Sequence, residues 1–156
     1  MKIERKVAEM LIDTRKTLSL AESCTGGMVT SMLTDISGSS SFLKYTVVAY
    51  SYESKVKILK IPQKVLDKHG AVSKEVATLM AKNVRKILNT DYGVAITGVA
   101  GPTGGTPKKP VGLVYIAVAS KKEVKCLKCM FKGTRTQIRK QSANKALELL
   151  IRCHTP

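Results

Sequence analysis

Residues 21–27 of this 156-residue chain read Ala-Glu-Ser-Cys-Thr-Gly-Gly and directly follow the short apolar run 17–20. This pattern predicts a strand that ends at a turn carrying hydroxyl and thiol groups and then enters a helix. Adjacent glycines permit positive φ angles, and free backbone N–H groups at a helix start attract negative charge. Hydrolysis of a carbonyl compound needs such an anion-stabilising site beside its nucleophile. Ser23 is therefore the candidate nucleophile.

A serine nucleophile needs a base, and the chain has two histidines, His69 and His154. His154 lies near the end of the chain, where order is weakest, which leaves His69 or a lysine. A Ser–Lys pair is an alternative to Ser–His, but its amine must be neutral, and a free lysine has a pKa of ~10.4. Burial lowers that value. Lys55 is one of many lysines, and the alternative is that Ser23 caps a helix and Lys55 lies at the surface.

The elements that must position these groups follow from apolar periodicity and turn residues. Helices are expected at 3–15, 26–36, 53–60, 63–69, 74–88 and 135–152, and strands at 17–22, 44–51, 93–97, 111–119 and 123–131. The strand at 44–51 is expected to be buried. A loop rich in Gly and Pro, residues 98–110, joins two strands without a helix, so the sheet should be mixed. We expect one domain over residues 1–156, a three-layer α/β/α sandwich with a mixed, mostly parallel sheet.

Three segments lie at expected strand tips, namely residues 21–27, 50–55 and 97–106. Strand tips meet at one edge of an α/β sheet, where ligands bind. The third segment is rich in glycine, including Gly98 and Gly101, and its backbone can approach a phosphate or a ribose closely. The three segments together predict a site at this edge.

Composition narrows the choice of partners. The net charge is +16, which attracts anions, but aromatic residues make up only 4% of the chain and few can stack on bases. We therefore expect nucleic acid to bind only nonspecifically, if at all. No apolar run approaches the roughly 20 residues of a membrane span, and no secretory signal is evident. The expectation is a cytoplasmic protein without membrane partners.

The four cysteines are Cys24, Cys126, Cys129 and Cys153. Cys126 and Cys129 form a single CxxC within an expected strand, where residues three apart face opposite sides. Zinc would need two more ligands, and Cys153 and the neighbouring His154 are the only candidates. We favour reduced cysteines over a metal or redox site, and we expect no metal.

Several ordered motifs resemble the C-terminal domain of the CinA (competence-damage-inducible) family, whose stand-alone members include nicotinamide-nucleotide amidases of the PncC type. The resemblance spans roughly residues 4–152. It rests on the blocks Ala21–Gly27, Gly38–Ser40, Val48–Ser51, Lys55, His69–Ser73, Ile96–Pro102, Gly104–Pro107 and Lys109–Gly112.

The resemblance implies that the carboxamide of nicotinamide mononucleotide is hydrolysed to nicotinate mononucleotide and ammonia, by a Ser–Lys mechanism without metal or cofactor. By position, Ser23 would be the nucleophile and Lys55 the base. Tyr52 stands where an asparagine is common in the family, and its hydroxyl would hydrogen-bond the lysine amine. The family also implies a homo-oligomer.

The resemblance further implies a substrate-binding set. It comprises the turn residues Cys24, Thr25, Gly26 and Gly27, the loop residues Thr97, Gly98 and Gly101, and Arg135 and Arg139. Backbone N–H groups of the turn would hold the oxyanion, and either arginine would grip the substrate phosphate. Two alternatives remain, an inactive nucleotide-binding member of the family and a nucleic-acid-associated protein of competence or recombination.

Overall fold

Five strands form one sheet in the order β2-β1-β3-β4-β5 in the computed structural model, which describes residues 1–154. Strand β1 pairs in parallel with β2 and with β3, whereas β3–β4 and β4–β5 are antiparallel. The strands are β1 (Leu18–Glu22), β2 (Leu43–Val48), β3 (Tyr92–Gly98), β4 (Leu113–Ala119) and β5 (Val124–Met130). The expected mixed sheet is confirmed, and the loop after β3 is the connection that reverses the chain.

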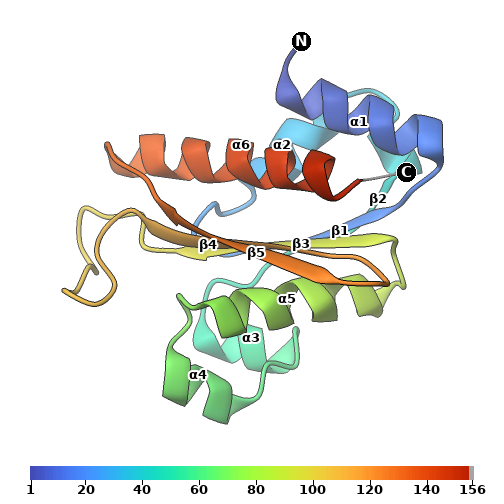
Figure 1. Cartoon of the computed structure of the whole chain (residues 1–156). Coiled ribbons are helices and arrows are strands. Elements are labelled where there is room, and N and C mark those ends of the chain that lie inside the picture. Colours follow the sequence, from blue (N-terminus) through green and yellow to red (C-terminus); the bar gives the residue numbers. More distant parts are fainter. Residues whose placement is uncertain (155–156) are drawn as a thin grey trace.

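Helices cover both faces of the sheet, which gives the expected three layers (Figure 1). One face carries α1 (Ile3–Thr14), α2 (Met28–Thr34) and α6 (Arg135–Cys153). The other face carries α3 (Tyr52–Lys57), α4 (Gln63–His69) and α5 (Lys74–Ile87), and a short 3-10 turn (Ser39–Ser41) precedes β2. None of the helices in residues 1–154 is long and apolar enough to cross a membrane.

Each helix layer seals its own apolar cluster against the sheet. Residues of α1, α2 and α6 pack with Leu20, Val94 and Ile116 on one face, and α5 packs with Ala21, Ala95 and Ala117 on the other. The alternation of strand side chains produces this division. It also separates the CxxC cysteines, as expected, because Cys126 packs into the α5 cluster and Cys129 into the opposite one.

Several elements begin or end at other residues than the sequence predicts; helix α3, for example, ends at Lys57 instead of residue 60. Strand β2 stops at Val48 and is only half buried, because it is the edge strand and has β1 as its one partner. Helix α2 begins at Met28 rather than at residue 26, because Gly26 and Gly27 have φ angles of 60° and 101°. Those values lie outside the helical region, so the two glycines form a turn in front of the helix.

Strand β1 is the point at which the order of successive strands in the sheet changes direction. The chain leaves β1 to form β2 on one side and later returns to form β3 on the other. A crevice forms beyond the carboxyl ends of strands at such a point, and ligands bind there. Glu22 and Gly98, the last residues of β1 and β3, mark this edge.

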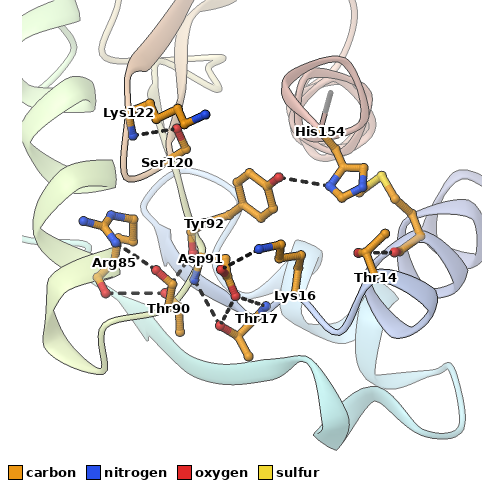
Figure 2. A network of polar contacts seen from close by, with 11 residues as sticks. Thr14, Lys16, Thr17, Arg85, Thr90, Asp91, Tyr92, Ser120, Lys122 and His154 are labelled. Atoms are coloured by element: carbon orange, nitrogen blue, oxygen red, sulfur yellow. Dashed lines mark hydrogen bonds and ion pairs between the residues drawn. The ribbon is translucent and has the colours of Figure 1, made fainter. Parts of the chain in front are cut away.

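A polar network fixes the opposite edge of the sheet, where β1 and β3 begin (Figure 2). Asp91 accepts hydrogen bonds from the backbone N–H of Thr17 (2.9 Å), its hydroxyl (3.0 Å) and Lys16 Nζ (3.3 Å). Tyr92 Oη and His154 Nδ1 lie 3.0 Å apart. The network ties the start of β1 to the start of β3 and to the end of α6.

Candidate active site

Ser23 follows β1 directly and lies at the predicted strand tip. Its backbone N–H donates to the carbonyl of Ile96 in β3 (3.1 Å), so the residue is fixed between two parallel strands. The Ser23 residue is 8% exposed. The hydroxyl therefore faces a confined space at the edge where the topology predicts ligands.

Lys55 is held on α3 by the start of that helix. Ser51 and Ser54 form a reciprocal capping box, in which each side chain accepts from the backbone N–H of the other. A capping box satisfies two N–H groups that a helix start otherwise leaves free. Lys55 follows one residue later and is 1% exposed, although its helix lies at the outer layer. The capped helix start therefore holds the backbone of Lys55 in place, and its side chain points toward the interior.

The amine of Lys55 makes three short contacts. Its Nζ lies 3.0 Å from Ser23 Oγ, 2.7 Å from the carbonyl of Ala49 and 3.2 Å from the carbonyl of Tyr50. Within residues 1–154 no carboxylate forms an ion pair with it. Burial lowers the pKa of Lys55 to about 8. A neutral amine can donate its two protons to the carbonyls and turn its lone pair to Ser23.

Neither histidine reaches Ser23. His69, at the end of α4, lies 3.7 Å from the Glu75 carboxylate, and His154 meets Tyr92 at the opposite edge of the sheet. Of the bases that the sequence leaves open, the described structure thus brings Lys55 to the serine.

Cys24 neighbours the nucleophile but is poorly suited to replace it. Burial raises the pKa of its thiol to about 11. The thiolate is the reactive form of cysteine, so this thiol stays protonated near neutral pH. Cys24 is buried and packs into the core cluster beneath α2 and α6.

The donors around Ser23 differ from the expected helix start. The carboxylate of Glu22 accepts from the backbone N–H groups of Val29 (3.0 Å) and Thr30 (2.9 Å) and from the Thr30 hydroxyl (2.7 Å). It thereby occupies the N–H groups of the first helical turn. An oxyanion must then be held by the turn that precedes α2.

Within that turn, two of the nearest N–H groups are also engaged. The N–H of Ser23 donates to Ile96, and the N–H of Gly26 donates to the carbonyl of Ser23 (3.0 Å). The N–H groups of Cys24, Thr25 and Gly27 have no acceptor in residues 1–154, and of these three residues Cys24 lines the cleft over Ser23. The residue after a nucleophile commonly supplies an oxyanion donor in hydrolases with a strand–turn–helix nucleophile. The backbone N–H of Cys24, and not its thiol, is therefore the group suited to binding an oxyanion.

A cleft of about 270 Å³ opens over the serine and the lysine. Six of the expected residues line it besides Lys55, namely Ser23, Cys24, Thr97, Gly98, Gly101 and Arg135. Thr25, Gly26, Gly27, Tyr52 and Arg139, which were also expected in the site, are not among its lining residues. Its volume lies at the small end of ligand pockets, which span about 300–1,000 Å³.

The hydroxyl of Tyr52 has a different contact from the one expected, and it shares its partner, residue 71, with the hydroxyl of the cleft-lining Thr97. Tyr52 Oη accepts from the backbone N–H of Ala71 (3.1 Å) instead of holding the Lys55 amine, and Thr97 Oγ1 donates to the carbonyl of Ala71 (2.9 Å). The expected contact between Tyr52 and Lys55 is therefore wrong. Both hydroxyls fix residue 71, which together with Val72 lines the cleft.

The two arginines, which the sequence could not separate, have different environments. Arg139 donates from Nε to the carbonyl of Cys24 (3.0 Å) and from Nη2 to the carbonyl of Thr25 (2.8 Å). The Arg139 guanidinium thus holds the turn that carries Ser23, and it is not among the residues that line the cleft. Arg135 lines the cleft and donates to the carbonyl of Gly101 (2.7 Å) and to Tyr50 Oη (3.2 Å).

The expected site did not include seven residues that line the cleft, namely Tyr50, Ala71, Val72, Val99, Ala100, Thr103 and Gly104. The last four lie in the glycine-rich segment 97–106, which the sequence placed at this edge. Tyr50 lies inside the strand-tip segment 50–55, so that position was a usable signal. Ala71 and Val72 follow α4, and apolar residues between two helices carry no chemical signal of their own. Lys109 of the long loop donates to the carbonyl of His69, which holds this stretch against the loop.

Comparisons with known proteins agree with this architecture. The family described as "CinA C-terminal domain" matches residues 1–154. A "CinA-like protein" of Endomicrobium trichonymphae is 52% identical over 143 residues, which are 92% of this chain and 33% of that protein. A "CinA-like protein" of Syntrophus aciditrophicus is 47% identical over 96% of this chain and 36% of its own length. The chain thus spans about a third of the curated relatives it matches.

Solved structures cover the chain almost completely. The competence/damage inducible protein CihA from Agrobacterium tumefaciens superposes with a TM-score of 0.96 at 34% identity, over 98% of this chain and 94% of that one. A competence or damage-inducible protein from Enterobacter asburiae gives 0.93 at 30% identity, over 98% and 96%. Because the family match and these likenesses extend over nearly all described residues, the chain belongs to the CinA C-terminal domain family.

Proposed function

We propose that this protein is an amidase that hydrolyses the carboxamide of nicotinamide mononucleotide to nicotinate mononucleotide and ammonia. The observation that carries the proposal is the buried amine of Lys55, 3.0 Å from Ser23 Oγ, with a pKa lowered to about 8. With a pKa of about 8, the buried amine is about one-tenth neutral at pH 7, and the neutral form is the one that a general base requires. Family membership supports the same chemistry.

In the first half of the proposed reaction, Ser23 Oγ attacks the carboxamide carbon while its proton passes to neutral Lys55 Nζ. The negative charge that develops on the carboxamide oxygen is held by the N–H of Cys24. Lys55 then gives the proton to the leaving nitrogen, the C–N bond breaks and ammonia departs. An acyl ester on Ser23 remains.

The second half repeats these transfers with water. Lys55 takes a proton from a water molecule whose oxygen attacks the ester carbon, and it returns the proton to Ser23 Oγ as the ester bond breaks. The acid product and the free serine result. The two carbonyls that hold Nζ, those of Ala49 and Tyr50, keep the amine aimed at Ser23 in both halves.

Arg135 is the arginine we propose for the substrate phosphate. It lines the cleft, and a guanidinium has five N–H donors. Arg135 contacts Gly101 and Tyr50, which also line the cleft, and its donors beyond the two in these contacts remain for a bidentate contact with phosphate. The +16 net charge of the chain also attracts a phosphorylated substrate.

The test is ammonia release from nicotinamide mononucleotide by the purified protein, with Ser23→Ala as the control. We expect ammonia from the wild type alone, with a rate that rises with pH and levels off above about 8 as Lys55 loses its proton. Thermal stabilisation by the nucleotide without ammonia would contradict the amidase and support an inactive nucleotide-binding protein.

A further inference from the structure

Arg139 is the cationic side chain bound to the back of the nucleophile turn, and it does not line the cleft. A guanidinium that binds backbone carbonyls beside a nucleophile can serve the fold or the chemistry. A role in the chemistry requires that its contacts lead to the N–H group that would hold the oxyanion, which is that of Cys24. They reach that group through two consecutive hydrogen-bonded peptide units.

The first step joins Arg139 to Gly26. Arg139 Nη2 donates to the carbonyl of Thr25 at 2.8 Å. That carbonyl shares its peptide plane with the N–H of Gly26, and the two groups of a trans peptide point in opposite directions. The N–H of Gly26 donates in turn to the carbonyl of Ser23 at 3.0 Å.

The second step joins Gly26 to the cleft. The carbonyl of Ser23 shares its peptide plane with the N–H of Cys24, which has no acceptor within residues 1–154 and belongs to a residue lining the cleft. A hydrogen bond to a carbonyl polarises its peptide, and consecutive bonds strengthen one another. The charge on Arg139 therefore makes the N–H of Cys24 a stronger donor, and the bonds fix its direction.

Two local features agree with this arrangement. Arg139 Nε also donates to the carbonyl of Cys24 at 3.0 Å, so the same side chain holds two successive peptide planes. Position 26 is glycine with a φ of 60°, and a Cβ there would lie 3.1 Å from Arg139 Nη2. A side chain at position 26 would be strained and would crowd the guanidinium.

We propose that Arg139 is a positioning residue for the oxyanion donor, and that it acts through Gly26 and the Ser23 carbonyl on the N–H of Cys24. This inference rests on the proposed acyl transfer at Ser23. It differs from a phosphate-binding role, which would alter substrate affinity and leave small reagents without a nucleotide phosphate unaffected.

Diisopropyl fluorophosphate provides a probe that carries no nucleotide. Ser23 Oγ attacks its phosphorus, the P–F bond breaks, fluoride leaves, and the hydroxyl proton passes to Lys55. The negative charge gathers on the phosphoryl oxygen, as it does on a carbonyl oxygen. Loss of one oxyanion donor elsewhere slows catalysis by about 10²–10³-fold. For a donor that remains but is misaligned, we expect Arg139→Gln to slow labelling of Ser23 on the order of 10- to 100-fold.

Lys140→Gln is the matched control, because it removes one positive charge from the exposed neighbour on the same helix. We expect it to label at the wild-type rate. With nicotinamide mononucleotide, Arg139→Gln should lower kcat by a similar factor and leave KM within about threefold. Arg139→Lys keeps the charge but lacks the planar fork that spans two carbonyls, so it should fall between Arg139→Gln and wild type. It also replaces Arg139→Gln if that variant does not fold.

The outcomes separate the two proposals. Slow labelling by folded Arg139 variants supports the inference, even if the wild type releases no ammonia and the substrate proposal fails. Wild-type labelling rates in both Arg139 variants overturn it, as does a raised KM with unchanged kcat. A wild type that neither labels at Ser23 nor releases ammonia overturns both proposals.

Discussion

The two edges of the sheet each place a lysine beside polar partners, but under opposite conditions. At the edge where β1 begins, Lys16 is exposed and lies 3.3 Å from the Asp91 carboxylate (Figure 2). At the edge where β1 ends, Lys55 is buried against two carbonyls and a serine, with no carboxylate in ion-pair range among the described residues.

The two arrangements have opposite effects on protonation. Partial burial acts to raise the pKa of Asp91, but hydrogen bonds from Thr17 and Lys16 lower it below the ordinary 3.8. Burial without a counter-charge lowers the pKa of Lys55 to about 8. Hydrogen bonds to the Asp91 carboxylate stabilise the folded chain, whereas an unpaired buried lysine is destabilising, and such groups cluster at functional sites. The volume of the cavity does not distinguish the two edges, because the cavity beside Lys16, of about 390 Å³, is larger than the cleft beside Lys55, of about 270 Å³.

The sharpest test of the comparison removes the amine at each edge. We expect Lys55→Met to lower kcat for ammonia release by on the order of 10²–10⁴-fold, because a general base contributes about that much. Lys16→Met, the same substitution at the opposite edge, should leave kcat unchanged. Steady-state assays of both variants check this, and equal losses would refute a special role for the buried amine.

The second test concerns stability and pH. Between pH 8 and 10.5 the unfolded chain binds a proton at Lys55 that the folded chain has released, so the free energy of unfolding rises with pH. Relative to Lys55→Met, the wild type should gain about 3 kcal/mol across this range, at about 1.4 kcal/mol per pH unit. Urea unfolding at pH 7 and pH 10.5 measures it. A pH-independent difference between the two proteins would show that the lysine is not destabilised by burial.

The third test addresses the paired edge. Asp91→Asn should lower the free energy of unfolding at pH 7 by about 1–3 kcal/mol, because hydrogen bonds to a charged acceptor are replaced by weaker ones. A carboxyl with a lowered pKa stabilises the fold above its unfolded pKa and loses that effect as pH falls. The difference from wild type should therefore shrink below pH 3.8, as urea unfolding can check, while kcat at pH 7 stays unchanged.

The smallest effect is expected at the wall of the cleft. Tyr52→Phe removes the acceptor for the N–H of Ala71, a hydrogen bond of about 0.5–1.5 kcal/mol, so kcat/KM should fall no more than about tenfold. The pH at which the rate levels off should stay near that of the wild type. A shifted pH profile would instead indicate that Tyr52 acts on the Lys55 amine.

Site features that depend on neighbouring residues were easier to predict from the sequence than features that depend on residues far apart in the chain. The turn 21–27 could be recognised from local chemistry, since two adjacent glycines permit the positive φ angles of a tight turn next to a hydroxyl. Strand tips could be assigned to one edge because parallel strands must align. The partner of each polar side chain was less predictable. Tyr52 and Thr97 bind the backbone of residue 71, and Arg139 binds carbonyls of the turn 21–27, although no local pattern pairs these groups.

The sequence by itself determined the order of the elements, the three layers and the candidate nucleophile, because periodicity and turn residues act over a few neighbouring positions. Only the tertiary structure decided which of the many basic residues meets Ser23. The burial that lowers the pKa of Lys55 is created by segments 49–50 and 23–24, brought together by the sheet. Charge state depends on that enclosure, and no local pattern encodes it.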